Sequence, residues 1–511
     1  MNDNLFEIKN LNVYSKGNKI VDNLNFKIKK NTILGIVGES GSGKSITALS
    51  ILKLSRFRGL NQSGDIYFSN SNLKKFSGNN YKNFLKNDVG IIFQDPSSYL
   101  NPSIKCGNQL IECFQKNYSS NTENVNIAIE LLEKVKINDP TSTLKKYPHQ
   151  LSGGQQQRLM IAMMISKKPK ILICDEATSS LDSLVKKEII SLIMTLKNEY
   201  KMSLILITHN LNIVYKISDN IIFLKDGKII EKGETKKIFK NPKMLYTKNL
   251  ISLNKSFKID KINFEKNKLE ILKVNNLNLK LTGKQILNNI NFSLFKNDSL
   301  GIIGESGSGK TTISKCILKI YKDYSGDIFY NSKNLKTLNR ISISKEIQTI
   351  FQDPYSSLDP SISIINQIIE PLKFHNLISK KKLHSEAVNI LRSVKLKNNL
   401  YNKLPSELSG GERQRVVIGR ALTMKPKILI CDECVSALDK NIQNSILNLL
   451  IELKNKFSLS IIFISHDIRI VKSICNRIMV LKSGEVVDLN DSKKLFKNPS
   501  SYTRSLINAI I

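Results

Sequence analysis

Short apolar runs recur along this chain, and most of them end at a glycine or a polar residue. Four of these runs lie at Thr32–Gly38, Leu204–Ile207, Ser299–Gly304 and Ile461–Ile464. Short runs that are rich in β-branched residues predict interior strands of a parallel sheet, buried on both faces. None of them approaches the roughly 20 residues of a membrane-spanning helix. We therefore expect a soluble chain, so that any membrane-spanning part must come from another polypeptide.

The segments around these runs complete the pattern of an α/β protein. Each half of the chain opens with a strand-like segment, at Leu5–Tyr14 and at Leu269–Leu281. A helical pattern follows each glycine loop, and a more polar helical pattern separates the FQDP and LSGG sequences of each half. The sequence thus predicts two α/β cores, each with an inserted helical subdomain.

The two halves carry the same motifs in the same order. From LSGG to the aspartate of ILICDE is 24 residues in both halves, and from that aspartate to a histidine is 34 in both. Such a duplication predicts two equivalent domains that work as a pair. We place the first domain at residues 1–253, a lysine-rich linker at 254–268 and the second domain at 269–511.

The composition changes this picture little. A net charge of +35 would suit nucleic acid or an anionic membrane as a partner. However, the excess of lysine, asparagine and isoleucine is what an AT-rich coding bias produces. The seven cysteines show no disulfide spacing, which suits a reducing cytoplasm. Cys431 and Cys434 form a CxxC, but a metal site needs more ligands than lie nearby, so a buried strand end is favoured.

A phosphate-binding loop stands between a strand and a helix in each half. The sequences GESGSGKS and GESGSGKT fit the pattern GxxxxGK[ST]. Its glycines let backbone N–H groups and a helix N-terminus face an anion. Lys44 and Lys310 would reach the β- and γ-phosphates of ATP, and Ser45 and Thr311 would ligate Mg²⁺. The predicted ATP-binding loops comprise Gly38, Glu39, Ser40, Gly41, Ser42, Gly43, Lys44 and Ser45, and Gly304, Glu305, Ser306, Gly307, Ser308, Gly309, Lys310 and Thr311.

Carboxylates at strand ends supply the next part of the chemistry. Asp175 and Asp432 each end an apolar strand, where a carboxylate can hold the hydration shell of Mg²⁺. The adjacent Glu176 and Glu433 are placed to polarise an attacking water. Helix caps or solvated charges would not explain why both copies carry the same Asp-Glu pair behind the same strand.

Two further motifs complete each set. His209 and His466 end another apolar strand at the same offset, which favours a γ-phosphate contact over a structural role. The LSGG sequences have no evident role within their own half, but their N–H groups suit a second anion contact at a helix N-terminus. The pairing of two such loops with two phosphate loops predicts a head-to-tail arrangement, in which each nucleotide is closed over by the opposite half.

Together these motifs resemble the ATP-binding cassette (ABC) superfamily, over nearly the whole chain and in both halves. The resemblance implies two tandem P-loop domains that bind and hydrolyse ATP, each with a RecA-like core, an antiparallel β subdomain and a helical subdomain. FQDPSSYLNP, FQDPYSSLDP and the closing NP…YT…L segments are similar to the ATPase subunits of peptide/nickel-type importers. The double cassette in one chain resembles the fused form of those subunits in bacterial peptide and glutathione uptake.

The resemblance also implies roles for individual residues. Gln94 and Gln352 would couple Mg²⁺ and the attacking water to the membrane partner, and Asp182 and Asp439 would lie at the interface between the halves. Contacts to the nucleotide held by the other half are implied for Ser152, Gly154, Ser409 and Gly411. The implied Mg²⁺ ligands are Ser45, Gln94, Asp175, Thr311, Gln352 and Asp432.

The family also has an aromatic ring that stacks on adenine, ahead of the phosphate loop. Tyr14, 24 residues before Gly38, takes this place in the first half, and Lys280 takes it in the second. Weaker base stacking is therefore expected at the second site. Some relatives bind an iron–sulfur centre through cysteines near the C-terminus, but no cysteine follows Cys475, so none is expected here.

The implied function is that of the energising subunit of a bacterial importer for peptides or peptide-like solutes. Such a subunit would lie at the cytoplasmic face of the plasma membrane with two integral membrane permease subunits. An extracytoplasmic solute-binding protein would take part indirectly, and no nucleic acid is expected. The alternative is a soluble twin-cassette ATPase that acts on ribosomes or nucleic acid. Three features count against that alternative: the linker is short, the FQDP and YT…L sequences resemble those of importers, and no added arm or zinc knuckle is visible.

Overall fold

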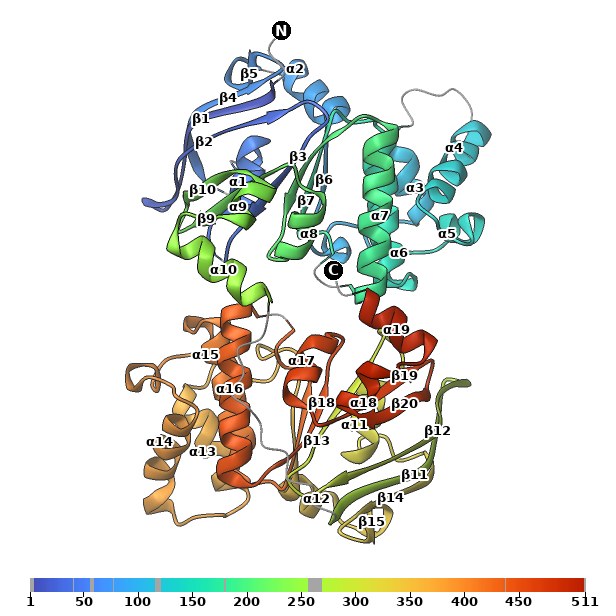
Figure 1. The fold of residues 1–511 in the computed structure, drawn as a ribbon, viewed down its shortest axis with the longest axis vertical. Coiled ribbons are helices and arrows are strands. Elements are labelled where there is room, and N and C mark those ends of the chain that lie inside the picture. The colour runs from blue at the N-terminus through green and yellow to red at the C-terminus, as the bar shows by residue number, and fades with distance from the viewer. Residues whose placement is uncertain are drawn as a thin grey trace. The chain divides into compact units, whose positions relative to one another are not determined.

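The structure is a computed structural model that describes residues 4–39, 41–55, 59–76, 78–114, 121–178, 181–255, 269–436 and 438–509. It contains two compact units, and the boundary between them falls between Lys255 and Ser256. The two units share one order of strands and the same two kinds of sheet (Figure 1). The duplication seen in the sequence is therefore a duplication of the fold.

The described residues of the first unit form two sheets. Their strands are β1 (Asn4–Ser15), β2 (Asn18–Lys29), β3 (Ile33–Val37), β4 (Asn61–Phe68), β5 (Ser71–Asn72), β6 (Val89–Ile92), β7 (Ile171–Asp175), β8 (Ser203–Ile207), β9 (Asn220–Lys225) and β10 (Lys228–Glu234). One sheet is antiparallel, in the order β2-β1-β4-β5, and the other has the order β10-β9-β3-β8-β7-β6. In the second sheet β9, β3, β8, β7 and β6 are parallel, and β10 pairs antiparallel with β9.

The helices of the first unit fall into two groups. They are α1 (Lys44–Ile51), α2 (Gly78–Asn83), α3 (Cys106–Glu112), α4 (Asn121–Lys134), α5 (Pro140–Lys145), α6 (Gly153–Ile165), α7 (Ser183–Glu199), α8 (Leu211–Ile217), α9 (Thr235–Lys240) and α10 (Leu245–Lys255). Helices α3 to α6 come between β6 and β7 and gather beside the parallel sheet, which confirms the inserted helical subdomain (Figure 1). Helix α10 includes the first two residues of the linker predicted at 254–268, and residues 256–268 lie outside the described ranges.

The second unit repeats this architecture. Its strands are β11 (Glu270–Leu281), β12 (Lys284–Phe295), β13 (Ser299–Gly304), β14 (Ser325–Tyr330), β15 (Lys333–Asn334), β16 (Ile347–Ile350), β17 (Ile428–Asp432), β18 (Ser460–Ile464), β19 (Arg477–Lys482) and β20 (Glu485–Asp491). The sheet orders are β12-β11-β14-β15 and β16-β17-β18-β13-β19-β20. The helices are α11 (Lys310–Ile317), α12 (Arg340–Glu346), α13 (Ile364–Phe374), α14 (Leu383–Ser393), α15 (Gly410–Leu422), α16 (Lys440–Phe457), α17 (Ile468–Ile474), α18 (Ser492–Lys497) and α19 (Ser501–Asn508).

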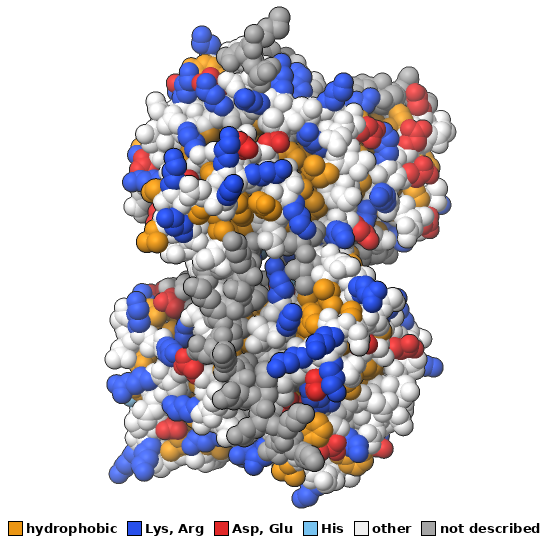
Figure 2. Space-filling view, in the orientation of Figure 1, with side chains coloured by type: hydrophobic (Ala, Val, Ile, Leu, Met, Phe, Trp, Pro, Cys, Tyr) orange, Lys and Arg blue, Asp and Glu red, His pale blue; other side chains and the backbone are white. Residues whose placement is uncertain are grey.

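The central strands are buried on both faces, as their apolar runs predict. Every residue of β3, β7, β8, β13, β17 and β18 is buried. Cys431, in β17, and the nearby Cys434 are also buried, which confirms the strand-end interpretation of the CxxC. Among the described residues, no helix combines the length and the apolar character that crossing a bilayer requires. Lysine and arginine side chains are scattered over the visible face of both units rather than gathered in one patch (Figure 2).

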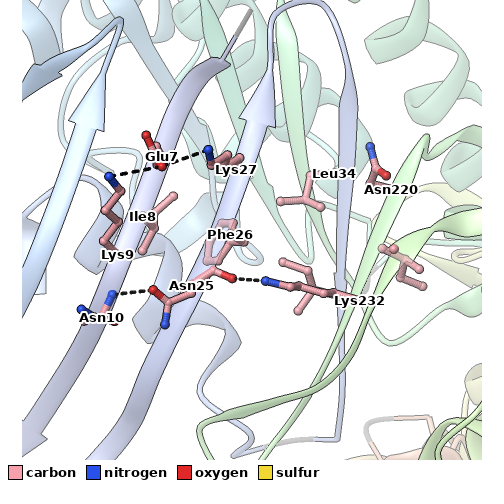
Figure 3. Close-up of a pocket in the computed structure, with 13 residues that line it drawn as sticks. Glu7, Ile8, Lys9, Asn10, Asn25, Phe26, Lys27, Leu34, Asn220 and Lys232 are labelled. Atoms are coloured by element: carbon pink, nitrogen blue, oxygen red, sulfur yellow. Dashed lines mark hydrogen bonds and ion pairs between the residues drawn. The ribbon is translucent and has the colours of Figure 1, made fainter. Parts of the chain in front are cut away.

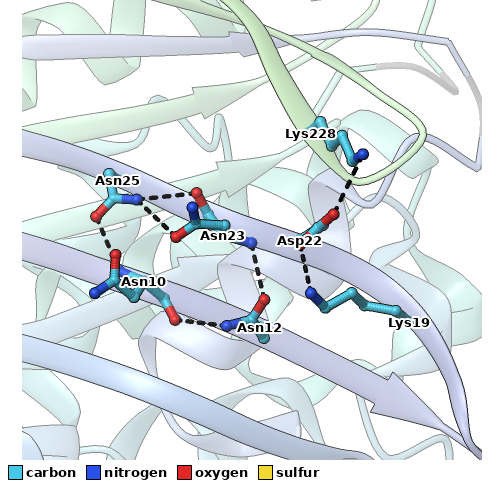
Figure 4. Close-up of polar contacts among 7 residues, drawn as sticks. All are labelled: Asn10, Asn12, Lys19, Asp22, Asn23, Asn25 and Lys228. Carbon is cyan, nitrogen blue, oxygen red and sulfur yellow. Dashed lines mark hydrogen bonds and ion pairs between the residues drawn. The ribbon is translucent and has the colours of Figure 1, made fainter.

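A ladder of asparagines joins β1 to β2 on the exposed side of the antiparallel sheet (Figure 4). The backbone N–H of Asn10 donates to Oδ1 of Asn25 at 2.9 Å, and that of Asn23 donates to Oδ1 of Asn12 at 3.0 Å. Asn10 and Asn23 have left-handed backbones, which asparagine tolerates, at points where the strand register shifts. The second unit repeats the ladder with Asn276, Asn278, Asn289 and Asn291. Some of the abundant asparagine is thus structural, which the composition alone does not reveal.

Candidate nucleotide-binding sites

The phosphate loop of the first unit joins β3 to α1 in a conformation that faces an anion. Gly41 and Gly43 have φ values of 80° and 94°, in the left-handed region that favours glycine, and Gly43 caps α1. Lys44 is buried, and its Nζ donates to the carbonyl oxygens of Gly38 at 3.0 Å and Glu39 at 2.8 Å. These bonds hold the ammonium group within the loop, where phosphate oxygens can take the place of the carbonyls.

The second phosphate loop has the same geometry. Nζ of Lys310 donates to the carbonyl oxygens of Gly304 at 2.9 Å and Glu305 at 2.7 Å. Gly307 and Gly309 are left-handed, with φ values of 76° and 102°. The buried hydroxyls of two further loop residues have no hydrogen-bond partner among the described residues: Ser42 and Ser308. Ser306 is exposed, and Ser40 lies outside the described residues. Both units are therefore shaped to bind phosphates.

A turn between the last two strands of each parallel sheet braces the phosphate loop. In the first unit the N–H of Gly227 donates to the carbonyl of Ser42 at 3.2 Å, and the N–H of Asp22 donates to the carbonyl of Gly227 at 2.9 Å. Gly484 makes the equivalent bond to Ser308 at 3.1 Å. Neither glycine belongs to the predicted site residues, although the Asp-Gly and Ser-Gly pairs that contain them are ordinary turn signals.

Replacing Gly227 with alanine is expected to destabilise the first unit by roughly 2–5 kcal/mol, from backbone strain and overpacking together. Its φ is +74°, and a Cβ would lie 2.1 Å from the carbonyl oxygen of Ile20, which cannot move without opening the sheet. ATP affinity should fall as well, because this turn braces the loop. The measurements are thermal unfolding and ATP titration.

The matched control for that substitution is Gly17→Ala. Gly17 has a similar left-handed φ of +85°, but a Cβ there would meet nothing within 4 Å. It should therefore cost only the backbone strain of about 1–2 kcal/mol and leave ATP binding unchanged. Equal losses of stability and affinity in the two variants would contradict the bracing role.

An oxygen pair suited to Mg²⁺ lies beside each loop. Oγ of Ser45 donates to Oδ1 of Asp175, the last residue of β7, at 3.0 Å. In the second unit the hydroxyl of Thr311 hydrogen-bonds to Asp432. Burial raises the pKa of Asp432, although the bond from Thr311 acts in the opposite direction. Hydroxyl and carboxylate oxygens are the ligands that Mg²⁺ prefers, so these residues fit the predicted metal.

The glutamate after each aspartate is held against a histidine. Nδ1 of His209 lies 3.3 Å from Oε2 of Glu176, and Nδ1 of His466 lies 3.4 Å from Oε2 of Glu433. Both glutamates have left-handed backbones, with φ values of 48° and 49°. A non-glycine residue in this conformation is strained, and such strain is concentrated at functional sites. The structure thus brings together two predicted residues that are 33 positions apart in the sequence.

The surroundings of Glu176 and Glu433 keep both carboxyls ionised. Burial opposes ionisation, but the hydrogen bond and charge of the neighbouring histidine, together with Lys44 or Lys310, outweigh burial and lower the pKa of each glutamate. An ionised carboxylate can accept a hydrogen bond from water and withdraw its proton. Each glutamate therefore has the charge state that polarising an attacking water requires.

Gln94 and Gln352 emerge at the same edge of the sheet as the aspartates. Each follows the end of an outer parallel strand, β6 or β16, by two residues. The registers pair Ile92 with Cys174 and Ile350 with Cys431, which places the strand ends side by side. Both glutamines are exposed.

The LSGG serines cap the helices that follow them. Ser152 begins α6 and Ser409 begins α15, and both serines are exposed. The glycines of the motif have a packing role within their own unit. A Cβ at Gly154 would lie 3.0 Å from a methyl of Val185 on α7, and one at Gly411 would lie 2.6 Å from a methyl on α16. Two aspartates predicted at the interface between the halves precede the same two helices as N-caps: Asp182 and Asp439.

Tyr14 and Lys280 hold equivalent places, but on the outer face of the antiparallel sheet. Tyr14 pairs with Lys19 and Lys280 with Gln285, in hairpins of the same length. The alternating neighbours Leu11 and Val13 are fully buried, so Tyr14 points to the opposite face. Nζ of Lys19 lies 5.8 Å from the centre of its ring on that exposed side.

The phosphate loop lies on the other face of this sheet. The nearest atoms to a Cβ at Gly43 are the carbonyl of Ile20 and a methyl of the buried Val21. At the ends of β1 and β11, Ser15 and Leu281 lie on the face that the phosphate loop covers, and Leu281 packs on the core. The placement of Tyr14 therefore gives no support to adenine stacking by its ring. Nor does it support weaker base stacking at the second site because of Lys280.

Both units of the chain are similar to known proteins. A family model described as ABC transporter matches residues 21–179 and 287–436. The glutathione import ATP-binding protein GsiA of Escherichia coli O6:H1 is 34% identical, over 98% of this chain and 89% of its own length. GsiA of Shigella dysenteriae serotype 1 is 34% identical, over 99% of this chain and 89% of its length. The solved structure of cbiO1 from Clostridium perfringens is 28% identical, over 47% of this chain and 92% of its own, with a TM-score of 0.41.

Proposed function

The chain belongs to the ABC transporter family, and on this premise we propose that it is the energy-coupling subunit of a bacterial importer. It is an ATPase with tandem nucleotide-binding domains in an α/β fold. The observation that carries the proposal is a complete set of loop lysine, strand-end carboxylates and histidine in both units. Relatives across nearly the whole chain are named for glutathione import, so a peptide-like solute is the proposed cargo.

Hydrolysis would proceed by in-line attack of water on the γ-phosphate. In the first unit Lys44 and the loop N–H groups would hold the phosphates and stabilise the developing charge. Glu176 would polarise the water, while His209 holds Glu176 in position and contacts the γ-phosphate. Ser45, Asp175 and Gln94 would hold Mg²⁺, which when bound would supply positive charge to the phosphates. The second unit offers the same groups: Lys310, Thr311, Gln352, Asp432, Glu433 and His466.

Transport would follow from closure of one half over the nucleotide of the other. Ser152 and Gly154 would contact the nucleotide in the second unit, and Ser409 and Gly411 would contact the nucleotide in the first. Support comes from the exposed serines at the N-termini of α6 and α15, where backbone N–H groups are left for an anion. ATP shifts the population toward the closed state because it makes more contacts there.

A surface of the first unit near Gln94 suits a membrane partner. A cavity of about 580 Å³ is lined by Tyr99, Ile104 and Met163, with Lys86 and Lys167 among the surrounding residues. The ring of Tyr99 stacks on Phe93, next to Gln94, with 3.7 Å between the ring centres. We propose that a cytoplasmic segment of a permease subunit docks in this cavity and moves Gln94 through the stacked rings.

The corresponding surface of the second unit has different chemistry. Arg420 takes the place of Met163 and pairs with Glu370 at 3.0 Å. It also donates to the carbonyl of Ser357, the residue equivalent to Tyr99, at 2.8 Å. The two permease subunits would therefore dock through different segments.

Exchanging Tyr99 for alanine together with Ile104→Asp is expected to reduce recovery of membrane subunits at least tenfold in a detergent pull-down. The change removes the aromatic wall and places a charge in the cavity, but it leaves the phosphate loop untouched. Tyr215→Ala is the matched control, because Tyr99 and Tyr215 are both 48% exposed and Tyr215 lies on α8. ATP binding should be normal in both variants, and unchanged recovery in the double variant would count against the docking site.

The proposed function is tested by a gentle detergent pull-down of the tagged chain from its native cells. Recovery of two integral membrane subunits, identified by mass spectrometry, is the expected result. Recovery of ribosomes or nucleic acid that is lost at high salt would favour the soluble twin-cassette alternative and overturn the importer. The identity of the recovered permease would then direct transport assays with peptides, glutathione and nickel.

A further inference from the structure

A second cavity of the first unit has no part in the nucleotide site. It measures about 580 Å³ and opens between the antiparallel sheet and the edge of the parallel sheet. Strands β1, β2, β3, β9 and β10 supply its walls (Figure 3). None of its lining residues belongs to the phosphate loop, the strand-end carboxylates or the LSGG motif. Its volume lies within the range of roughly 300–1,000 Å³ that small-molecule sites have.

The cavity has an apolar floor and a basic rim. Phe26, Leu34 and Ile222 form part of the floor, each no more than 6% exposed. Lys9, Lys27 and Lys232 stand around it (Figure 3). Their aliphatic stems add apolar surface, while the ammonium groups reach the solvent side.

The rim carries more positive than negative charge. The carboxylate of Glu7 pairs with Lys27 at 3.1 Å and with Lys9 at 3.5 Å. Nζ of Lys232 donates to the backbone carbonyl of Asn25 at 2.6 Å. Three ammonium groups thus face one carboxylate, which leaves a net positive charge at the mouth. A molecule with a short apolar body and one anionic head group complements this arrangement.

The second unit has different side chains at two of the equivalent positions. Arg477 stands at the start of β19, where the first unit has Asn220 at the start of β9. Its guanidinium donates to the carbonyl of Ser293 at 2.8 Å and lies 5.0 Å from the centre of the Phe295 ring. Leu489, which packs on the core, replaces Lys232 in the same register. In this part of the second unit, the arginine is therefore bonded within the unit, and a leucine takes the place of the rim lysine.

We propose that the cavity of the first unit binds a small amphipathic anion, a molecule with an apolar body and a single carboxylate- or sulfonate-type head. The apolar body lies on the floor beside Phe26 and Leu34, and the head group pairs with Lys232 and Lys27. Nothing in this proposal rests on the importer function, and the site is specific to the first half of the chain.

The position of the cavity couples it to the phosphate loop. Strands β2 and β10 form two of its walls. Farther along, the N–H of Asp22 in β2 donates to the carbonyl of Gly227, in the turn that leads into β10 (Figure 4 shows Asp22 with Lys19 and Lys228). Gly227 in turn bonds to Ser42 of the phosphate loop. A ligand that contacts both β2 and β10 would therefore restrain the two hydrogen bonds, Asp22–Gly227 and Gly227–Ser42, that support this loop.

The test uses two fluorescent probes that differ in the head group. Titration of the full chain with 8-anilinonaphthalene-1-sulfonate is expected to show one saturable site per chain. The neutral analogue N-phenyl-1-naphthylamine should bind that site at least tenfold more weakly, because it lacks the anion. Octanoate should compete with the sulfonate probe.

Two variants copy the side chains of the second unit into the first. Asn220→Arg should weaken binding of the sulfonate probe at least tenfold by filling the cavity. Lys232→Leu should abolish the preference for the anionic over the neutral probe. Asn198→Arg, an exposed change on α7 that adds the same charge elsewhere, is the control and should behave as the wild type. Unaltered ATP binding and unfolding temperature would show that the variants are folded.

The proposal is overturned if the wild type binds both probes equally, or if Asn220→Arg and Lys232→Leu bind the sulfonate probe as the wild type does. Loss of binding in the Asn198→Arg control as well would show that added charge, rather than cavity filling, is responsible, and would also overturn it.

Discussion

Replacing Glu176 and Glu433 together with glutamine is expected to reduce ATP turnover by about 10²–10⁴-fold while leaving ATP binding intact. Glutamine keeps the shape of the side chain but cannot withdraw a proton from water. Lys44, Lys310 and the phosphate-loop N–H groups, which bind the phosphates, are unchanged. Phosphate release and ATP titration measure the two properties separately.

The control for the glutamine variant is a pair of surface substitutions, Glu199→Gln and Glu452→Gln. These two glutamates lie on α7 and α16 and form exposed ion pairs with Lys134 and Lys395. Replacing them with glutamine removes the same number of negative charges as the double variant does. Turnover should stay at the wild-type level in the control. Brisk phosphate release by the Glu176→Gln, Glu433→Gln protein would remove both glutamates from the proposed mechanism.

Replacing Lys44 or Lys310 with alanine should weaken ATP binding in the unit concerned by about 2–5 kcal/mol, or roughly 30- to several-thousand-fold in Kd. Both lysines are buried, at 7% and 5% exposure, and each ammonium group donates to carbonyl oxygens of its own loop. Removing it leaves the bound phosphates without their closest positive charge. The double variant should bind ATP at neither site.

Two exposed lysines outside the sites, Lys216 on α8 and Lys373 on α13, provide the matching alanine controls. Their removal lowers the net charge by the same amount and should leave both affinities unchanged. If the controls weaken ATP binding as much as Lys44→Ala does, the long-range field of this basic chain, rather than the loop contact, would be responsible.

The central strands and the site beside them could be predicted from sequence because their signals are local. Strand β13 occupies the same residues, Ser299–Gly304, as the apolar run that predicts it. A strand that is buried on both faces must be apolar throughout, so its run is visible without any knowledge of its neighbours. The strand-end carboxylates follow directly, because a polar residue after such a run lies at the edge of the sheet.

The orientation of Tyr14 was harder to predict, because it depends on which face of β1 is buried. Counting back from the phosphate loop locates the right strand end but says nothing about the face. The period-two alternation of Leu11 and Val13 holds that information and places Tyr14 on the outer side. Spacing alone therefore locates a strand end without indicating the direction of the side chain.

Other features depend on contacts that no motif records. The hydrogen bond from Gly227 to Ser42 joins a turn to a loop that lies 185 residues away in the sequence. Asn220 lines the cavity beside Phe26, and the longer Arg477 takes the equivalent place in the second unit. Comparing the two halves reveals this difference, but only the fold shows which side chains fill the space.

The presence of two sites is tested most directly by the number of ATP molecules bound per chain in the Glu176→Gln, Glu433→Gln protein, counted by native mass spectrometry. Two are expected, because both units carry a complete site. One is expected when Lys44 or Lys310 is additionally replaced with alanine, and none when both are. A maximum of one ATP in the double-glutamine protein would contradict the claim that this chain holds two equivalent sites.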